Sequence, residues 1–144
     1  IEQLDFTKPN TISCSYHFPK KDLLKIKKIF RRLKIGIAIN PENFDKKYIE
    51  SIRKIVDVIY FDMNVYRKKS IKKYSLKKSI KQIQFIKSKN IPVYIGGGID
   101  KKNVSNILKQ IIPFGLDISR SLKNQRNLIS KSKLKDFLNQ ISVG

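Results

Sequence analysis

Several residue types are scarce in this sequence, and each shortage excludes a class of protein. The single cysteine, Cys14, excludes an internal disulfide framework and a cysteine-rich metal site. No run reaches the roughly 18 apolar residues that a membrane-spanning helix needs. Residues 1–10 have neither the basic nor the apolar segment of a signal peptide. We therefore expect a soluble protein of the reducing cytoplasm, with no membrane partner.

Acidic residues are also scarce, with 11 against 32 lysines and arginines, and the net charge is +21. Such a balance usually indicates an anionic partner such as nucleic acid. However, 26 of the 32 basic residues are lysines, a bias typical of an AT-rich genome. Arginines interleaved with aromatic residues are missing, as is any known nucleic-acid-binding motif. The charge is therefore interpreted as compositional drift, and nucleic acid is disfavoured as a partner.

The length of 144 residues fits a single domain spanning 1–144. It is short of the roughly 250 residues of a closed (β/α)8 barrel. The first residue is Ile1, which favours a fragment or a processed chain. If the fold is a barrel, we expect its N-terminal strands to be missing.

Four short runs of apolar and β-branched residues predict strands. Each run is too short for a helix and nearly continuous in apolar character, which is typical of strands covered on both faces. The runs are 34–40, 56–62, 91–97 and 114–119. Residues 1–6 are a further candidate strand, whereas residues 7–20, bounded by Pro9 and Pro19, are expected to form a loop or an irregular strand.

Helical patterns lie between and after these runs, with apolar residues spaced so that they share one helical face. The five stripes are Leu23, Ile26, Phe30 and Leu33; Ile49, Ile52 and Val56; Leu76, Ile80, Ile83 and Ile86; Val104, Ile107, Leu108 and Ile111; and Leu134, Phe137, Leu138 and Ile141. Strands that alternate with helices predict an α/β fold with a parallel sheet and right-handed crossovers.

In parallel α/β folds, ligands bind beyond the carboxyl ends of the strands. Three consecutive glycines, 96–98, follow the third predicted strand. They would let backbone N–H groups approach a phosphate, aided by a helix that begins near Asp100. The alternative is a tight strand-to-helix turn, although such a turn needs only one glycine.

Residues 119–121, which follow the fourth predicted strand, add Ser119 and Ser121 as hydrogen-bond donors and Arg120 as a positive charge beside the glycines. Asp62 ends the second predicted strand, where it is a candidate general acid or base, or a structural hydrogen-bond acceptor.

His17, the only histidine, has no visible partner and is assigned a loop or core role. Cys14 is interpreted as a small buried residue rather than a nucleophile.

Three segments at the C-terminal end fall in the order and spacing of a known family. PVYIGGGIDKKNV at 92–104, IIPFGLDIS at 111–119 and KLKDFLNQI at 133–141 resemble the seventh strand, eighth strand and last helix of phosphoribosylanthranilate isomerase. VIYFD at 58–62 resembles its sixth strand, whose terminal aspartate is the general acid. More weakly, IEQLD at 1–5 resembles the fourth strand, with Asp5 in place of a histidine.

The resemblance implies the C-terminal portion of a (β/α)8 barrel, about four to five βα units long. The implied activity is the Amadori rearrangement of N-(5-phosphoribosyl)anthranilate in tryptophan biosynthesis, an aldose–ketose isomerisation with a sugar-phosphate substrate. Asp62 would be the general acid. Substrate and phosphate would be held by Gly97, Gly98, Asp117, Ser119, Arg120, Ser121 and Ser70. No metal or organic cofactor is implied, because the reaction only moves protons, and fusion to or association with another enzyme of the pathway is a further implied partnership.

The sequence also departs from the family. In the family's glycine-rich phosphate loop only Ser70, Lys72 and Tyr74 remain, whereas Lys68, Lys69 and Ile71 replace glycines. Ser121 and Lys123 replace a glycine and a glutamate of the last turn. The family's general base lies on a first strand that this chain lacks. We therefore expect weakened substrate binding and little activity from the chain alone.

Three alternatives remain at this point. A ribulose-phosphate 3-epimerase-like enzyme is suggested by residues 35–43, but a glycine stands where that family has a catalytic aspartate before Gly-Gly. A non-catalytic, eroded barrel is suggested by the lysines at 68–73. A basic nucleic-acid-binding domain would bind with an affinity that falls steeply with salt.

Overall fold

The computed structural model of the chain describes residues 8–63 and 76–141, in which strands and helices alternate. The strands are β1 (Thr11–Ser15), β2 (Lys34–Ile39), β3 (Val58–Asp62), β4 (Val93–Gly96) and β5 (Gly115–Leu116). The helices are α2 (Lys20–Ile29), α3 (Lys46–Ile52), α4 (Leu76–Lys87), α5 (Val104–Gln110), the 3₁₀ helix η1 (Arg120–Leu122) and α6 (Lys131–Ile141). The expected α/β fold of successive strand–helix units is confirmed.

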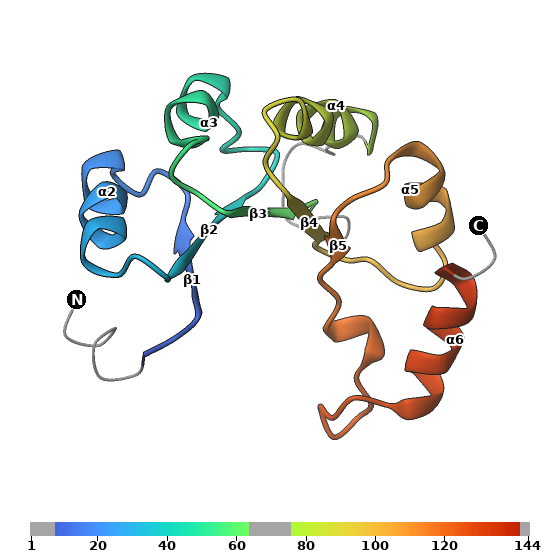
Figure 1. Cartoon of the computed structure of the whole chain (residues 1–144). Coiled ribbons are helices and arrows are strands. Elements are labelled where there is room, and N and C mark those ends of the chain that lie inside the picture. Colours follow the sequence, from blue (N-terminus) through green and yellow to red (C-terminus); the bar gives the residue numbers. More distant parts are fainter. Residues whose placement is uncertain (1–7, 64–75, 142–144) are drawn as a thin grey trace.

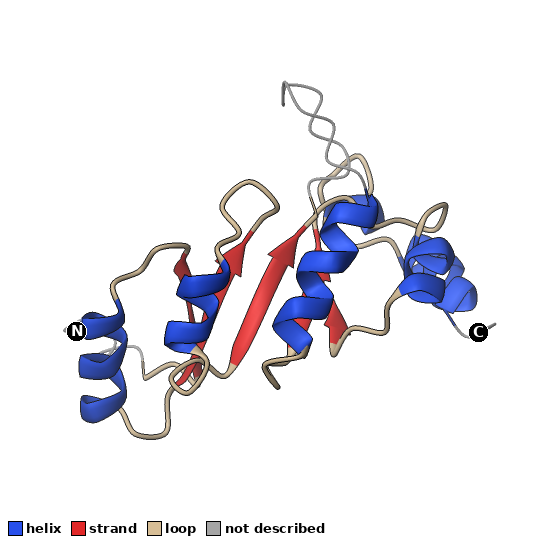
Figure 2. Cartoon of the chain, turned by 90° about the horizontal axis from the view of Figure 1, so that it is seen from above, coloured by secondary structure: helices blue, strands red, loops and turns tan. Residues whose placement is uncertain are grey.

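The five strands form one parallel sheet in the order β1-β2-β3-β4-β5. Neighbouring parallel strands need a crossover connection, which here is a helix in each case. The helices follow the sheet along one side, so that the described residues form an open arc (Figure 1), and the strands run side by side across it when seen from above (Figure 2). β1 and β5 are therefore the two edges of the described sheet.

The core lies between the sheet and the helices. In β2, every second residue points to the helices: Ile35, Ile37 and Ile39 are at most 2% exposed. Each helix adds fully or nearly fully buried residues, such as Leu23 of α2 and Ile49 of α3. Burying one such side chain is worth about 1.5–3 kcal/mol, so this interface is the main source of stability.

The other face of the sheet differs from the prediction of strands covered on both sides. Ser13 and Ala38 are exposed and Tyr60 and Tyr94 are only half-buried. Alanine and tyrosine at alternating positions made the runs look uniformly apolar. The sheet is therefore covered by helices on one face only, and its concave face carries small and aromatic side chains.

The N-terminal region is more regular than expected. Residues 11–15 form β1, which pairs in parallel with β2, within the stretch predicted as a loop or an irregular strand. The strand beside β2 at this edge of the described sheet is therefore β1. Residues 1–5 lie outside the described part of the chain. β1 was missed because its alternation of polar and apolar residues is short and lies between two prolines.

The predicted helical stripes are confirmed, with shifted boundaries. α2 ends at Ile29 and α3 at Ile52, so Leu33 and Val56 lie in the following connections, although both are buried. α5 begins at Val104 rather than near Asp100. The cause is a turn in which the Asp100 carboxylate accepts hydrogen bonds from the backbone N–H groups of Lys102 and Asn103, at 2.8 and 3.1 Å.

Candidate functional site

The candidate site lies at the carboxyl ends of β3, β4 and β5. Asp62 of β3, Gly97 after β4 and Ser119 after β5 line one cavity of about 400 Å³, which confirms that these residues gather at one end of the sheet. Its other lining residues come from the connections after β4 and β5. They are Gly98, Ile99, Asp100, Asp117, Ile118, Arg120 and Ser121. The cavity therefore collects every described residue that was predicted to bind substrate.

The glycine turn after β4 has the geometry expected of a loop that approaches a ligand closely. Gly97 and Gly98 have φ angles of 83° and 92°, in the region that strongly favours glycine. The Gly98 carbonyl accepts a hydrogen bond from the Asn103 side chain at 2.9 Å, and this bond holds the turn against the start of α5. α5 begins only at Val104 and has 7 residues, so the helix start lies four residues later in the sequence than the position predicted near Asp100. The backbone of the turn itself is what could contact an anion.

The connection after β5 is tied to the glycine turn by Ser121. Its hydroxyl donates to the backbone carbonyl of Ile99 at 2.8 Å, so the two connections are held together across the cavity. The hydroxyl proton of Ser121 is therefore already used in this hydrogen bond, and the role observed for Ser121 is to hold the two connections together. Ser119 and Arg120 are exposed at the cavity, where a hydroxyl and a guanidinium can reach an anionic group.

Two carboxylates lie on either side of β4. Asp62 is paired with Gly96 in the sheet, and the N–H of Asp117 donates to Ile95 at 2.8 Å on the other side of the strand. Their α-carbons are roughly 10 Å apart, because neighbouring strands are about 4.8 Å apart. A Cβ on Gly96 would lie 3.0 Å from the Asp117 backbone carbonyl oxygen, so glycine is what allows this close arrangement. Both residues line the cavity of about 400 Å³.

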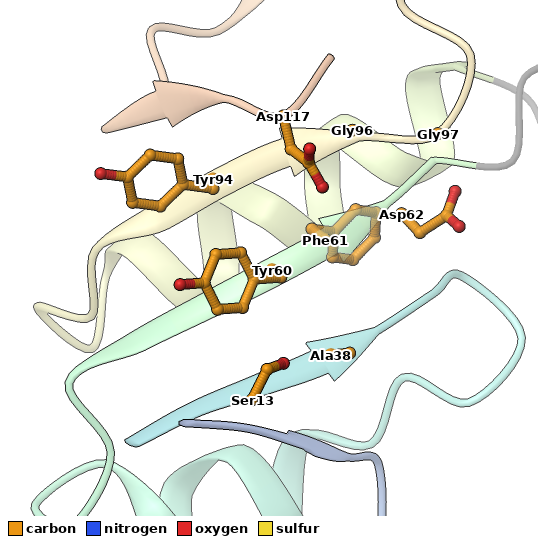
Figure 3. A pocket seen from close by; sticks show the side chains of 9 residues that line it. All are labelled: Ser13, Ala38, Tyr60, Phe61, Asp62, Tyr94, Gly96, Gly97 and Asp117. Atoms are coloured by element: carbon orange, nitrogen blue, oxygen red, sulfur yellow. The ribbon is translucent and has the colours of Figure 1, made fainter. Parts of the chain in front are cut away.

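A second cavity, of about 370 Å³, continues from these carboxylates down the concave face (Figure 3). Its wall includes Tyr60 and Tyr94, whose ring centroids are 5.7 Å apart. Each ring covers a glycine of a neighbouring strand: a Cβ on Gly36 would lie 2.4 Å from the Tyr60 ring, and one on Gly115 would lie 2.3 Å from the Tyr94 ring. The site is therefore continuous with an aromatic surface.

The two tyrosines were missed from the sequence. Tyr60 precedes Asp62 by two residues, and Tyr94 precedes Gly96 by two. Residues two apart in a strand point to the same face, so this spacing was the available signal. The tyrosines were instead counted as parts of uniformly buried strands.

The other candidates lie elsewhere. Ser70 and the lysines at 68–73 are outside the described residues. Cys14 is buried on the helix-facing side of β1, where burial raises the pKa of its thiol, in agreement with a structural role. His17 is exposed in the turn after β1 with a φ of 63°, and its ring packs on Tyr16, so the loop role is the one observed.

Within residues 8–63 and 76–141, no three histidine, cysteine or acidic side chains cluster as metal ligands would. None of the helices in the same ranges combines the length and the apolar character needed to span a bilayer.

The site and fold can now be compared with known proteins. No family model matches the sequence. The chain is 32% identical over 63 residues to the N-(5'-phosphoribosyl)anthranilate isomerase of Methanococcus maripaludis, which is 44% of this chain and 29% of that protein. Its fold matches the structure of N-(5'-phosphoribosyl)anthranilate isomerase from Pyrococcus furiosus, with a TM-score of 0.70, 18% identity and coverage of 99% of this chain and 67% of the other. The structure of the phosphoribosyl anthranilate isomerase from Thermococcus kodakaraensis matches with a TM-score of 0.71 and 17% identity. That match covers 99% of this chain and 68% of the other.

The resemblance to phosphoribosylanthranilate isomerase is confirmed. The five parallel βα units of the chain match about two thirds of the barrels of these isomerases. The matched stretch of the Methanococcus isomerase is a smaller part of that protein, 29%. The likeness therefore establishes the fold, which is that of five βα units of an isomerase-type barrel.

Proposed function

We propose that this chain is the phosphate-binding and acid-bearing part of a phosphoribosylanthranilate isomerase-type enzyme. Its reaction would be the Amadori rearrangement of N-(5-phosphoribosyl)anthranilate in tryptophan biosynthesis. The observation that carries the proposal is that Asp62, the glycine turn and Ser119 surround one cavity. They do so in a fold that matches isomerases of this kind.

The phosphate would bind at the outer part of the cavity. Backbone N–H groups of Gly97 and Gly98, the Ser119 hydroxyl and the Arg120 guanidinium all line it. These groups are hydrogen-bond donors, and a phosphate offers only acceptors when it is fully ionised. Ser121 would keep the two connections at a fixed separation through its bond to Ile99.

The sugar would then extend toward the carboxylates. Asp62 would donate its proton to the ring oxygen, so that the furanose opens and the bond from C1 to nitrogen becomes an iminium. Loss of the C2 proton to a base gives an enolamine, which becomes the aminoketose. Asp117, across Gly96 from Asp62, would accept hydrogen bonds from the substrate's hydroxyl or amine groups. The base is assigned to no residue described here.

The whole reaction would need more than this chain. The chain spans about two thirds of the matched isomerase structures, so the groups that complete the active site would come from βα units that this chain does not match. The phosphate contacts proposed above, by contrast, would all come from residues of this chain. The proposal can therefore be tested by binding before it is tested by turnover.

Nuclear magnetic resonance provides this test through the backbone amides. Titration of the ¹⁵N-labelled chain with ribose 5-phosphate should shift the amide signals of Gly97, Gly98 and Ser119, and inorganic phosphate should compete. Signals of α3, on the far side of the sheet, are the internal control. Saturable shifts confined to other regions would overturn the proposal. A generic DNA duplex bound more tightly than ribose 5-phosphate, with a steep salt dependence, would favour the nucleic-acid alternative instead.

A further inference from the structure

A further cavity, of about 650 Å³, lies at the end of the sheet opposite the candidate site. Its lining residues precede β1 (Lys8, Pro9 and Asn10) or join α2 to β2 (residues 29–33). Because the strands are parallel, their amino ends share one edge of the sheet, and β1 and α2 lie at one end of the arc (Figure 1). The volume falls within the roughly 300–1,000 Å³ of sites that bind small molecules.

The charged side chains that line this cavity are all positive. They are Lys8, Arg31 and Arg32, and no acidic side chain lines the cavity within the part of the chain that the structure describes. Asp57, at the same end of the sheet, is already paired with Lys27 at 2.6 Å. The C-terminus of α2 adds only about half a negative charge. The cavity therefore carries an excess of positive charge, which an anionic ligand would balance.

Arg31 and Arg32, the arginine pair, are not explained by the drift that accounts for the lysines. Only 6 of the 32 basic residues are arginines, and drift toward lysine would replace arginine wherever either residue serves. A guanidinium donates two parallel hydrogen bonds to a phosphate, whereas an ammonium acts as a point charge. Two adjacent arginines at a cavity therefore favour a phosphate group as the anion.

The turn that carries the arginine pair is held in place by backbone hydrogen bonds. The Leu33 N–H donates to the Phe30 carbonyl at 3.0 Å, so the arginine pair occupies the two central positions of a turn and is exposed. The Lys34 N–H donates to the Asn10 carbonyl at 3.0 Å, which joins the two sides of the cavity. A ligand would therefore meet a backbone that is already ordered, which lowers the free-energy cost of binding.

The cavity also has an apolar wall. Ile29 is 49% exposed, Phe30 is half-buried and Leu33 is buried, and all three line the cavity. The face of a phenylalanine ring is a surface on which a flat ring can stack. Cationic donors and an aromatic face in one cavity are the arrangement expected for a phosphate ester that carries a flat ring.

We propose that this cavity binds a nucleoside phosphate. The phosphate would lie on the arginine pair and Lys8, and the base would lie against Phe30 and Ile29. The ligand would be a free nucleotide rather than a nucleic-acid strand, because the volume suits a single small molecule. It would bind independently of a sugar phosphate at the glycine turn, since the two cavities lie at opposite ends of the sheet.

Adenosine 5'-monophosphate is the probe for the first test. Titrated into the ¹⁵N-labelled full chain, it should shift the amide signals of Asn10, Arg31 and Arg32 in a saturable way. Its affinity should exceed that of inorganic phosphate by about tenfold or more, because the base adds stacking. Signals of Gly97 and Gly98 report separately on the candidate site. Shifts confined to those glycines, or equal affinities for the nucleotide and inorganic phosphate, would overturn the proposal.

Variants of the arginine pair provide the second test. Arg31→Gln with Arg32→Gln should weaken nucleotide binding by about tenfold or more, because charge-assisted hydrogen bonds are lost. The control, Lys20→Gln with Lys21→Gln, makes the same charge change at exposed positions of the first turn of α2 and should leave the affinity unchanged. Circular dichroism would show that both variants fold, since all four positions are exposed.

Three results of the variant experiment contradict the proposal. Equal weakening by both double variants would mean that diffuse charge binds the nucleotide. Full affinity in Arg31→Lys with Arg32→Lys would mean that the paired hydrogen bonds of the guanidinium groups are not used. An oligoadenylate that binds more than about tenfold more tightly than the nucleotide, with a steep salt dependence, would identify a nucleic-acid strand as the ligand instead.

Discussion

The carboxyl ends of β3–β5 and those of β1–β2 belong to the same rim of the sheet, yet they are built differently. After β4 and β5, glycines, serines and carboxylates surround a cavity. After β1 and β2, the polar groups are used to close the connections themselves. Asn40 and Asn43 exchange side-chain to backbone hydrogen bonds of 2.8 and 3.1 Å, and the Tyr48 hydroxyl donates to the Phe18 carbonyl at 3.0 Å.

The two regions differ in whether their hydrogen-bond donors are free to bind a ligand. A donor that already has an internal partner must lose that hydrogen bond before it can bind a ligand, which costs free energy. The glycine turn exposes its backbone to the cavity, while the Asn40–Asn43 turn consumes its own donors. The candidate site differs from the connections after β1 and β2 because its donors, Ser121 aside, have no internal partner among the described residues, and position on the rim alone does not explain the difference.

The largest expected effect concerns catalysis by Asp62. In a polypeptide that joins this chain to the βα units of the Pyrococcus isomerase that it does not match, Asp62→Asn should reduce kcat by about 10²–10⁴-fold, because a positioned proton donor is removed. Ribose 5-phosphate should still bind. The chain alone should show little or no turnover. Steady-state kinetics checks both, and robust turnover by the chain alone would mean that its catalytic base is among its own residues.

A smaller effect is expected from filling the floor of the concave face. Gly36→Ala would place a Cβ 2.4 Å from the Tyr60 ring. Overpacking of this kind destabilises by about 1–3 kcal/mol. Urea denaturation should show this loss in the wild-type background. The loss that Gly36→Ala causes should be smaller when it is measured relative to a Tyr60→Ala chain. Equal losses in the two backgrounds would show that the tyrosine is not the residue that excludes a side chain at position 36.

The smallest effect should come from the closed end. Tyr48→Phe removes the hydrogen bond to Phe18 and should reduce the free energy of unfolding by about 0.5–1.5 kcal/mol, without changing ribose 5-phosphate binding. A loss of affinity in this variant would contradict the separation of the two regions. Calorimetric titration of ribose 5-phosphate into the wild type and into Tyr48→Phe provides the comparison.

Tyr48 also predicts a pH dependence. Burial, with smaller contributions from Tyr16 and Cys14, raises its pKa to about 12. An unfolded tyrosine titrates near pH ~10. The folded state therefore holds the proton more tightly, so this contribution is complete below pH ~10 and is lost as the pH rises toward the folded pKa. Unfolding free energies measured across this range should fall less steeply in Tyr48→Phe.

Much of the fold was predictable because strand and helix periods are strong signals. The runs around Ile37, Ile59 and Ile95 and the helical stripes placed four strands and five helices in the right order. β1 escaped because five residues of alternating pattern between prolines carry little signal. At the site, Asp62 and the glycines were singled out because they follow predicted strands. The hydrogen bond from Ser121 to Ile99 and the start of α5 were not predictable, because they depend on contacts between residues that no local sequence pattern contains.

We propose that the backbone of the glycine turn, rather than the lysines at 68–73, binds the sugar phosphate. Calorimetric titration of ribose 5-phosphate at about 0.15 M salt, where exposed charges are largely screened, tests it directly. Gly97→Val should abolish binding, because valine disfavours the φ of 83° and its side chain would occupy the cavity. Lys68→Ala with Lys69→Ala should only weaken it. The reverse ranking, with binding retained in Gly97→Val and lost in the lysine variant, would contradict the account.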